Sequence, residues 1–205
     1  EMRARIEEMV GVSTRGMWVG TFHGLAHRFL KAHWEEAALP QNFQILDSED
    51  QQRLVKRIIR GLGLDDTRWV PREVAWFINA QKDEGLRPQH LKDDGDPTRH
   101  QLIKLYATYE DTCRRNGVVD FAELLLRCYE ILREAPGLGE HYRARFKHVL
   151  VDEFQDTNTI QYNWMKVLVG ATSVPFVVGD DDQSIYGWRG ARVENLQQFR
   201  RDFPG

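Results

Sequence analysis

Two short apolar runs that each end in acidic residues constrain the fold of this chain more than any other feature. The run 149–151 leads directly into Asp152 and Glu153, and the run 176–179 is followed by Asp180. Continuous apolar runs are typical of parallel strands covered on both faces, and ligands of open α/β sheets bind beyond the carboxyl ends of such strands. We therefore expect two buried parallel strands with a chemical site at their ends. The alternative is a strand followed by an acidic turn.

The middle of the chain has helical periodicity. Between about residues 25 and 144, apolar residues recur at a spacing near 3.6, and the pattern predicts no strand there. Asp47 fits a helix N-cap, and Pro71 fits the first turn of a helix. Asp120 and Glu123 have the spacing of a capping box. These signals predict several helices in succession.

Strand-forming segments lie at both ends of the chain. Residues 1–10 have the pattern of an amphipathic helix, and residues 17–22 predict a short strand before the helical part begins. We therefore predict an α/β fold in which 1–24 and 145–205 form a layer with a parallel sheet. Residues 25–144 are predicted to form an all-α insertion.

Composition limits the classes of protein only broadly. Hydrophobic residues make up 41% and charged residues 29% of the 205 residues, as in ordinary globular proteins. No apolar run has the length needed to span a bilayer, and Cys113 and Cys128 match no metal or redox spacing. We therefore expect a cytoplasmic protein with no membrane partner. The net charge of −3 neither requires nor excludes nucleic acid, because a binding groove needs only local positive charge.

The acidic strand ends suggest nucleotide chemistry. In P-loop NTPases an aspartate of this kind holds Mg²⁺, and a neighbouring carboxylate can act as general base. Asp152 and Glu153 fit these two roles, and Gln183 fits that of a γ-phosphate sensor. A phosphate-binding loop, however, needs G-x-x-x-x-G-K-[ST]. The stretch 11–16 has the glycine spacing, but methionine and tryptophan follow where lysine and a hydroxyl are required, so we reject it as a P-loop.

The segment 183–190 carries two aromatic residues, an arginine and flanking glycines. Tyr186 and Trp188 could stack on unpaired bases, each base contributing about 1–3 kcal/mol. Arg189 could contact a phosphate or an aromatic face. The structural alternative is a loop fixed to the core by its aromatic side chains.

These motifs together resemble the UvrD/Rep/PcrA group of superfamily 1 DNA helicases, and the resemblance covers essentially the whole chain. The matching motifs are Thr-Phe-His-Gly at 21–24, the box at 151–157 and the segment 178–191. Three stretches at 44–47, 81–85 and 119–125 also resemble the helical subdomain of that group.

The resemblance implies a 3′→5′ ATP-driven translocase that unwinds duplex DNA in repair, in the cytoplasm at the nucleoid. Its partners would be single-stranded DNA, the junction between single- and double-stranded DNA, and DNA-repair proteins. ATP and Mg²⁺ would be its cofactors. Asp152 would hold the metal, Glu153 would activate water and Gln183 would couple nucleotide state to DNA. The residues implied to contact single-stranded DNA are Thr21, Phe22, His23, Tyr186, Trp188 and Arg189.

The resemblance also assigns the subdomains. Residues 1–24 and 145–205 would form part of a RecA-like sheet subdomain (1A), and 25–144 the helical 1B subdomain. The phosphate-binding loop and second motor domain of the group are not among these 205 residues. We therefore expect the fragment alone to lack ATPase activity and to hold no nucleotide or metal. We also expect it either to dimerise through an exposed sheet edge or to be disordered over residues 1–20.

Two other functions remain open. The chain could be a non-enzymatic module that binds single-stranded DNA or another protein. A metal-dependent nuclease using Asp152, Asp180 and Asp182 is the weaker hypothesis, because it leaves the aromatic and arginine segment unexplained.

Overall fold

Helices form most of this protein, and its strands are short. The structure is a computed structural model that describes residues 2–180 and 194–204. The α-helices are α1 (Met2–Val10), α2 (Phe22–Ala32), α3 (Ser48–Gly61), α4 (Pro71–Asp83), α5 (Pro97–Asn116), α6 (Phe121–Glu134), α7 (Pro136–Arg145), α8 (Thr159–Leu168) and α9 (Glu194–Asp202). The strands are β1 (Gln44–Ile45), β2 (Val118–Val119), β3 (His148–Val151) and β4 (Val174–Val177), and the 3₁₀ helices are η1 (Pro88–His90) and η2 (Phe154–Asp156).

Side-chain caps fix where the helices begin. The Asp47 carboxylate accepts a hydrogen bond from the Asp50 amide at 2.8 Å, and Asp120 accepts one from the Glu123 amide at 2.7 Å. Pro71 occupies the first turn of α4. These features confirm the helix starts predicted from the sequence, because each cap satisfies an amide that has no partner within its helix.

Strands β3 and β4 form the parallel pair predicted from the two apolar runs. Leu150 pairs with Phe176 and Val151 with Val177. One face of the pair packs inward through Val151, whereas Leu150 is 71% exposed and Phe176 is 57% exposed. The prediction of strands covered on both faces is therefore wrong for the residues described. Apolar side chains occupy the open face, but no described element covers it.

Two other predictions of local structure are also wrong. Residues 17–20 form no strand, and Phe22 already belongs to α2, which Thr21 caps. Strands β1 and β2 pair in parallel within the part expected to be all helical. Helix α6 ends at Glu134, and Pro136 begins α7 directly after it, because proline suits the first turn.

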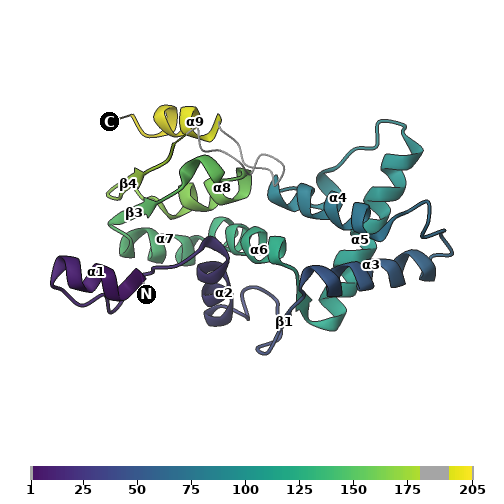
Figure 1. Ribbon diagram of the computed structural model, residues 1–205, viewed down its shortest axis with the longest axis horizontal. Helices are drawn as coiled ribbons and strands as arrows, with labels where there is room; N and C mark the ends of the chain where they lie inside the picture. The colour runs from purple at the N-terminus through teal and green to yellow at the C-terminus, as the bar shows by residue number, and fades with distance from the viewer. Residues whose placement is uncertain (1, 181–193, 205) are drawn as a thin grey trace.

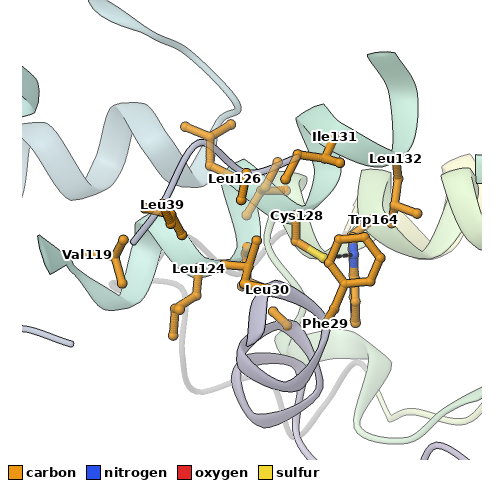
Figure 2. Packing of buried hydrophobic residues seen from close by; sticks show 14 of the residues in the cluster. Phe29, Leu30, Leu39, Val119, Leu124, Leu126, Cys128, Ile131, Leu132 and Trp164 are labelled. Carbon is orange, nitrogen blue, oxygen red and sulfur yellow. Dashed lines mark hydrogen bonds between the residues drawn. The ribbon is translucent and has the colours of Figure 1, made fainter. Parts of the chain in front are cut away.

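The main hydrophobic cluster surrounds α6. Helices α2 and α8 pack on either side of it and contribute Phe29, Leu30 and Trp164. Figure 2 shows the Trp164 indole directed at the Cys128 sulfur, to which its nitrogen donates a hydrogen bond at 3.0 Å. This contact satisfies a buried polar group inside an otherwise apolar cluster.

Two smaller clusters lie on either side of this centre. One joins α3, α4 and α5, which lie together at one end of the molecule (Figure 1). The other lies beneath β3 and β4 at the opposite end and includes Phe154, Tyr162 and Met165. The molecule is thus a helical part and a small sheet part joined through α6.

A buried ion cluster connects helices α4 and α6 with η1. The Lys82 ammonium lies 2.8 Å from both the Asp120 and the Glu123 carboxylates. Arg87 pairs with Glu123 at 2.8 Å and with Glu130 at 2.8 Å, and it also contacts Glu110. Burial lowers the pKa of Lys82, but the two carboxylates outweigh it and raise that pKa above its ordinary value. The ammonium therefore stays charged inside the protein.

Candidate functional site

The predicted acidic pair lies immediately after β3. Asp152 and Glu153 are both exposed, and the Asp152 carboxylate accepts a hydrogen bond from the Glu153 amide at 2.9 Å. The backbone of Glu153 is in the left-handed region, with φ of 51°. Such a conformation costs a non-glycine residue about 1–3 kcal/mol and is enriched at functional sites. It turns the chain sharply from the strand into η2.

The ends of β3 and β4 are held together beyond the strands themselves. The Val178 amide donates to the Val151 carbonyl, and the Phe154 amide donates to the Val178 carbonyl, each at 2.9 Å. The Phe154 side chain is buried against Tyr162 and Phe199. Asp152 and Glu153 thus lie on an exposed turn, and the next residue, Phe154, anchors that turn to the core.

Gln155, which was not among the predicted site residues, contacts Glu153 directly. Its side-chain nitrogen donates to Glu153 Oε2 at 2.6 Å, and its side-chain oxygen accepts from the Asp180 amide at 3.0 Å. Gln155 is only 3% exposed. The sequence shows that Gln155 lies within the motif at 151–157, but its contact with Asp180 depends on the pairing of β3 with β4.

The Thr-Phe-His stretch lies at the start of α2. Thr21 caps the helix by accepting from the Gly24 amide at 3.1 Å, and Phe22 packs against Trp164 with ring centroids 5.8 Å apart. His23 is partly buried, and this burial lowers its pKa, so the ring is neutral at pH 7. The His23 ring meets the edge of Phe121 at 6.1 Å. Phe121 is 48% exposed and was not singled out by its sequence.

Four predicted site residues, Gln183, Tyr186, Trp188 and Arg189, lie outside the described residues, as does Asp182 of the nuclease hypothesis. Within 2–180 and 194–204, no cluster of three or more His, Cys, Asp or Glu side chains has the arrangement of a metal site. Exposed carboxylates such as Asp152 and Glu153 are still suitable oxygen ligands for a Mg²⁺ ion that arrives with a nucleotide. In the described part of the chain, no helix has the length and apolar character needed to cross a membrane.

Comparison with known proteins identifies the family. Residues 1–204 match the UvrD/REP helicase N-terminal domain. The chain belongs to this family. This membership confirms the predicted fold class, which is a partial RecA-like parallel sheet interrupted by a large helical insertion.

Several UvrD/REP relatives match the whole chain. It is 59% identical to DNA helicase II of Salmonella typhimurium and of Escherichia coli over 205 residues. It is 34% identical to the ATP-dependent DNA helicase PcrA of Staphylococcus epidermidis, again over 205 residues. The match covers 100% of this chain but 28% of each of these relatives.

Proposed function

We propose that this chain is the part of an ATP-dependent 3′→5′ DNA helicase of DNA repair that carries its metal-binding and water-activating carboxylates. The observation that carries the proposal is the pair Asp152 and Glu153 on a constrained turn at the carboxyl end of β3. Ligands of α/β sheets bind at that edge. Membership of the UvrD/REP helicase family supports the same conclusion.

The two carboxylates have different roles in this proposal. Asp152 would bind the Mg²⁺ ion of the nucleotide, and Glu153 would accept a proton from the attacking water as general base. When bound, ATP with its Mg²⁺ supplies the phosphoryl group that is transferred to that water. Gln183 would sense the nucleotide and couple its state to DNA.

The DNA-binding surface that we propose starts at the first turn of α2. The rings of His23 and Phe121 are partly exposed and contact each other, which supports a role in stacking on bases, and Thr21 and Phe22 lie next to them in the chain. Tyr186, Trp188 and Arg189 would extend the same surface. The partners we propose are single-stranded DNA, its junction with a duplex, and DNA-repair proteins at the nucleoid.

A polypeptide of these 205 residues alone would behave differently. It contains no G-x-x-x-x-G-K-[ST] loop, so we propose that it has no ATPase activity and only binds single-stranded DNA. The half-exposed ring of Phe121 favours this second, non-enzymatic function. We also expect it to dimerise through an exposed edge of the sheet formed by β3 and β4, and sedimentation velocity measures this directly.

The test is DNA-stimulated ATP turnover by the full-length protein that contains this chain. Glu153→Gln keeps the shape of the side chain but removes the base, so turnover should fall about 10²- to 10⁴-fold. Glu140→Gln is the matched control, because Glu140 is an exposed residue of α7 and should leave turnover unchanged.

Two results would contradict the proposal. Equal turnover by the parent protein and Glu153→Gln would exclude the role of general base. Turnover by the 205-residue polypeptide above that of the same polypeptide with Glu153→Gln would show that it is active alone.

A further inference from the structure

We propose that Gln155 is a positioning residue for ATP hydrolysis, which holds the Glu153 carboxylate and connects it to the backbone that follows β4. The inference rests on the proposed function, because it concerns the same carboxylate. Its basis is independent of the family: the side-chain amide of Gln155 lies between the ends of two strands and contacts both.

The chemistry of the two contacts fixes the orientation of the amide. The Asp180 backbone N–H can only donate, so the Gln155 oxygen faces it at 3.0 Å. An ionised Glu153 carboxylate can only accept, so the Gln155 nitrogen faces it at 2.6 Å. Rotating the amide by half a turn would replace both hydrogen bonds with repulsive contacts. Gln155 therefore contacts the Glu153 carboxylate and the Asp180 amide at the same time.

Gly179 permits this close approach. A Cβ atom at position 179 would lie 2.5 Å from the Gln155 side-chain oxygen and 3.1 Å from the amide nitrogens of Phe154 and Gln155. Two of these three contacts are with backbone, which cannot move as a flexible side chain could. A residue without a side chain is therefore required at the place where the end of β4 passes the Gln155 amide.

The backbone of the acidic box leaves Glu153 dependent on this contact. Glu153 is exposed and adopts a φ of 51°, and among residues 2–180 and 194–204 Gln155 is the buried side chain that reaches its carboxylate. A general base works only when its carboxylate is aimed at the reacting water, and small misplacement can cost about 10²-fold in rate. A buried donor at 2.6 Å restricts the carboxylate to one direction.

The second contact gives the arrangement a function beyond support. Asp180 begins the segment that continues to Gln183, the predicted sensor of the nucleotide. A displacement of the Asp180 amide pulls on the Gln155 oxygen, and the rigid amide plane transfers that movement to Glu153. Gln155 thus makes the aim of the general base depend on the position of the chain after β4.

The experiment measures kcat and KM for ATP in the full-length protein, with saturating single-stranded DNA. Gln155→Met keeps the length and volume of the side chain but removes both hydrogen bonds, so kcat should fall about 10- to 100-fold while KM changes less than about twofold. Gln155→Glu keeps an oxygen for the Asp180 amide but removes the donor to Glu153 and adds a like charge. Its kcat should fall at least as far.

Gln51→Met is the matched control for loss of packing and hydrogen bonds. Gln51 is 5% exposed and is hydrogen-bonded to Asn79 and Asp120 in the helical insertion, so its replacement should lower Tm but leave kcat unchanged. Gly179→Ala is a second perturbation that leaves Gln155 itself intact, and it should lower kcat through the contacts described above.

The possible results separate this inference from the proposed function. If Glu153→Gln abolishes turnover but Gln155→Met and Gln155→Glu keep the parent kcat, Gln155 has no positioning role and only this inference is overturned. If Gln155→Met fails to fold, Gln155→Glu decides the question by the same criterion. If Glu153→Gln itself keeps full turnover, the proposed function fails together with the inference.

Discussion

Lys82 offers the most direct test of how the helical insertion is stabilised. Its side chain is 2% exposed, and its ammonium lies 2.8 Å from the carboxylates of both Asp120 and Glu123. Lys82→Met retains most of the aliphatic stem but removes the charge. The two carboxylates then remain buried without the cation that lies between them.

The expected loss of stability depends on which partners of the two carboxylates remain after the substitution. Removing one partner of a buried ion pair costs about 3–5 kcal/mol, because the other charge stays buried without compensation. Asp120 keeps the Tyr109 hydroxyl at 2.8 Å, and Glu123 keeps Arg87 and Arg127, each at 2.8 Å. We therefore expect the lower end of the range, about 3 kcal/mol, which corresponds to about 6–12 °C in Tm for a chain of this size.

Urea unfolding of the 205-residue polypeptide at pH 7, followed by far-ultraviolet circular dichroism, measures this free energy. Lys56→Met is the control, because Lys56 is exposed and lies 3.9 Å from Asp66, so its loss should cost no more than about 1 kcal/mol. A loss below about 1 kcal/mol for Lys82→Met, or equal losses for the two variants, would refute the reasoning.

Three further predictions concern single positions. Burial, together with the charges of Asp120 and Glu84, raises the pKa of Asp83 to about 7. The folded state therefore favours the protonated carboxyl, and the free energy of unfolding falls as pH rises from about 4 to 7. Asp83→Asn should therefore be more stable than the parent by about 2–4 kcal/mol at pH 8 but not at pH 4, as measured by urea unfolding. Gly117→Ala should lower stability by at least about 1–2 kcal/mol in thermal melts, because φ there is 63° and a Cβ would lie 2.7 Å from Pro40. Phe121→Ala should weaken binding of a labelled single strand by about 1–3 kcal/mol in fluorescence anisotropy, and unchanged affinity would remove the ring from the DNA surface.

Local chemistry made part of this fold predictable. The caps at Asp47 and Asp120 act within three residues of themselves, so their sequence neighbours are sufficient to identify them. The apolar runs that became β3 and β4 were also recognisable, as were the carboxylates that follow them. Strands β1 and β2 have two residues each and are too short to show any periodicity.

The remaining features depend on parts of the chain that are distant in sequence. Residues 17–22 were predicted to form a strand, but Trp18 packs edge-on against Tyr142 and Phe146. An apolar pattern indicates which residues can be buried, but it does not show whether another element covers them. Leu150 lies in such a pattern and is exposed. Gln155 could not be assigned a partner because Asp180 is 25 residues away.

The packing of α6 bears on whether the helical insertion can be treated as a transferable module. The predicted boundaries at residues 25 and 144 would separate α6 from α8, yet Cys128 and Trp164 share one cluster and one hydrogen bond. A graft of residues 25–144 into another scaffold would leave that flank of α6 without its partner. A working graft would have to carry a substitute for α8, and exchanges between related proteins should keep these two helices from the same parent.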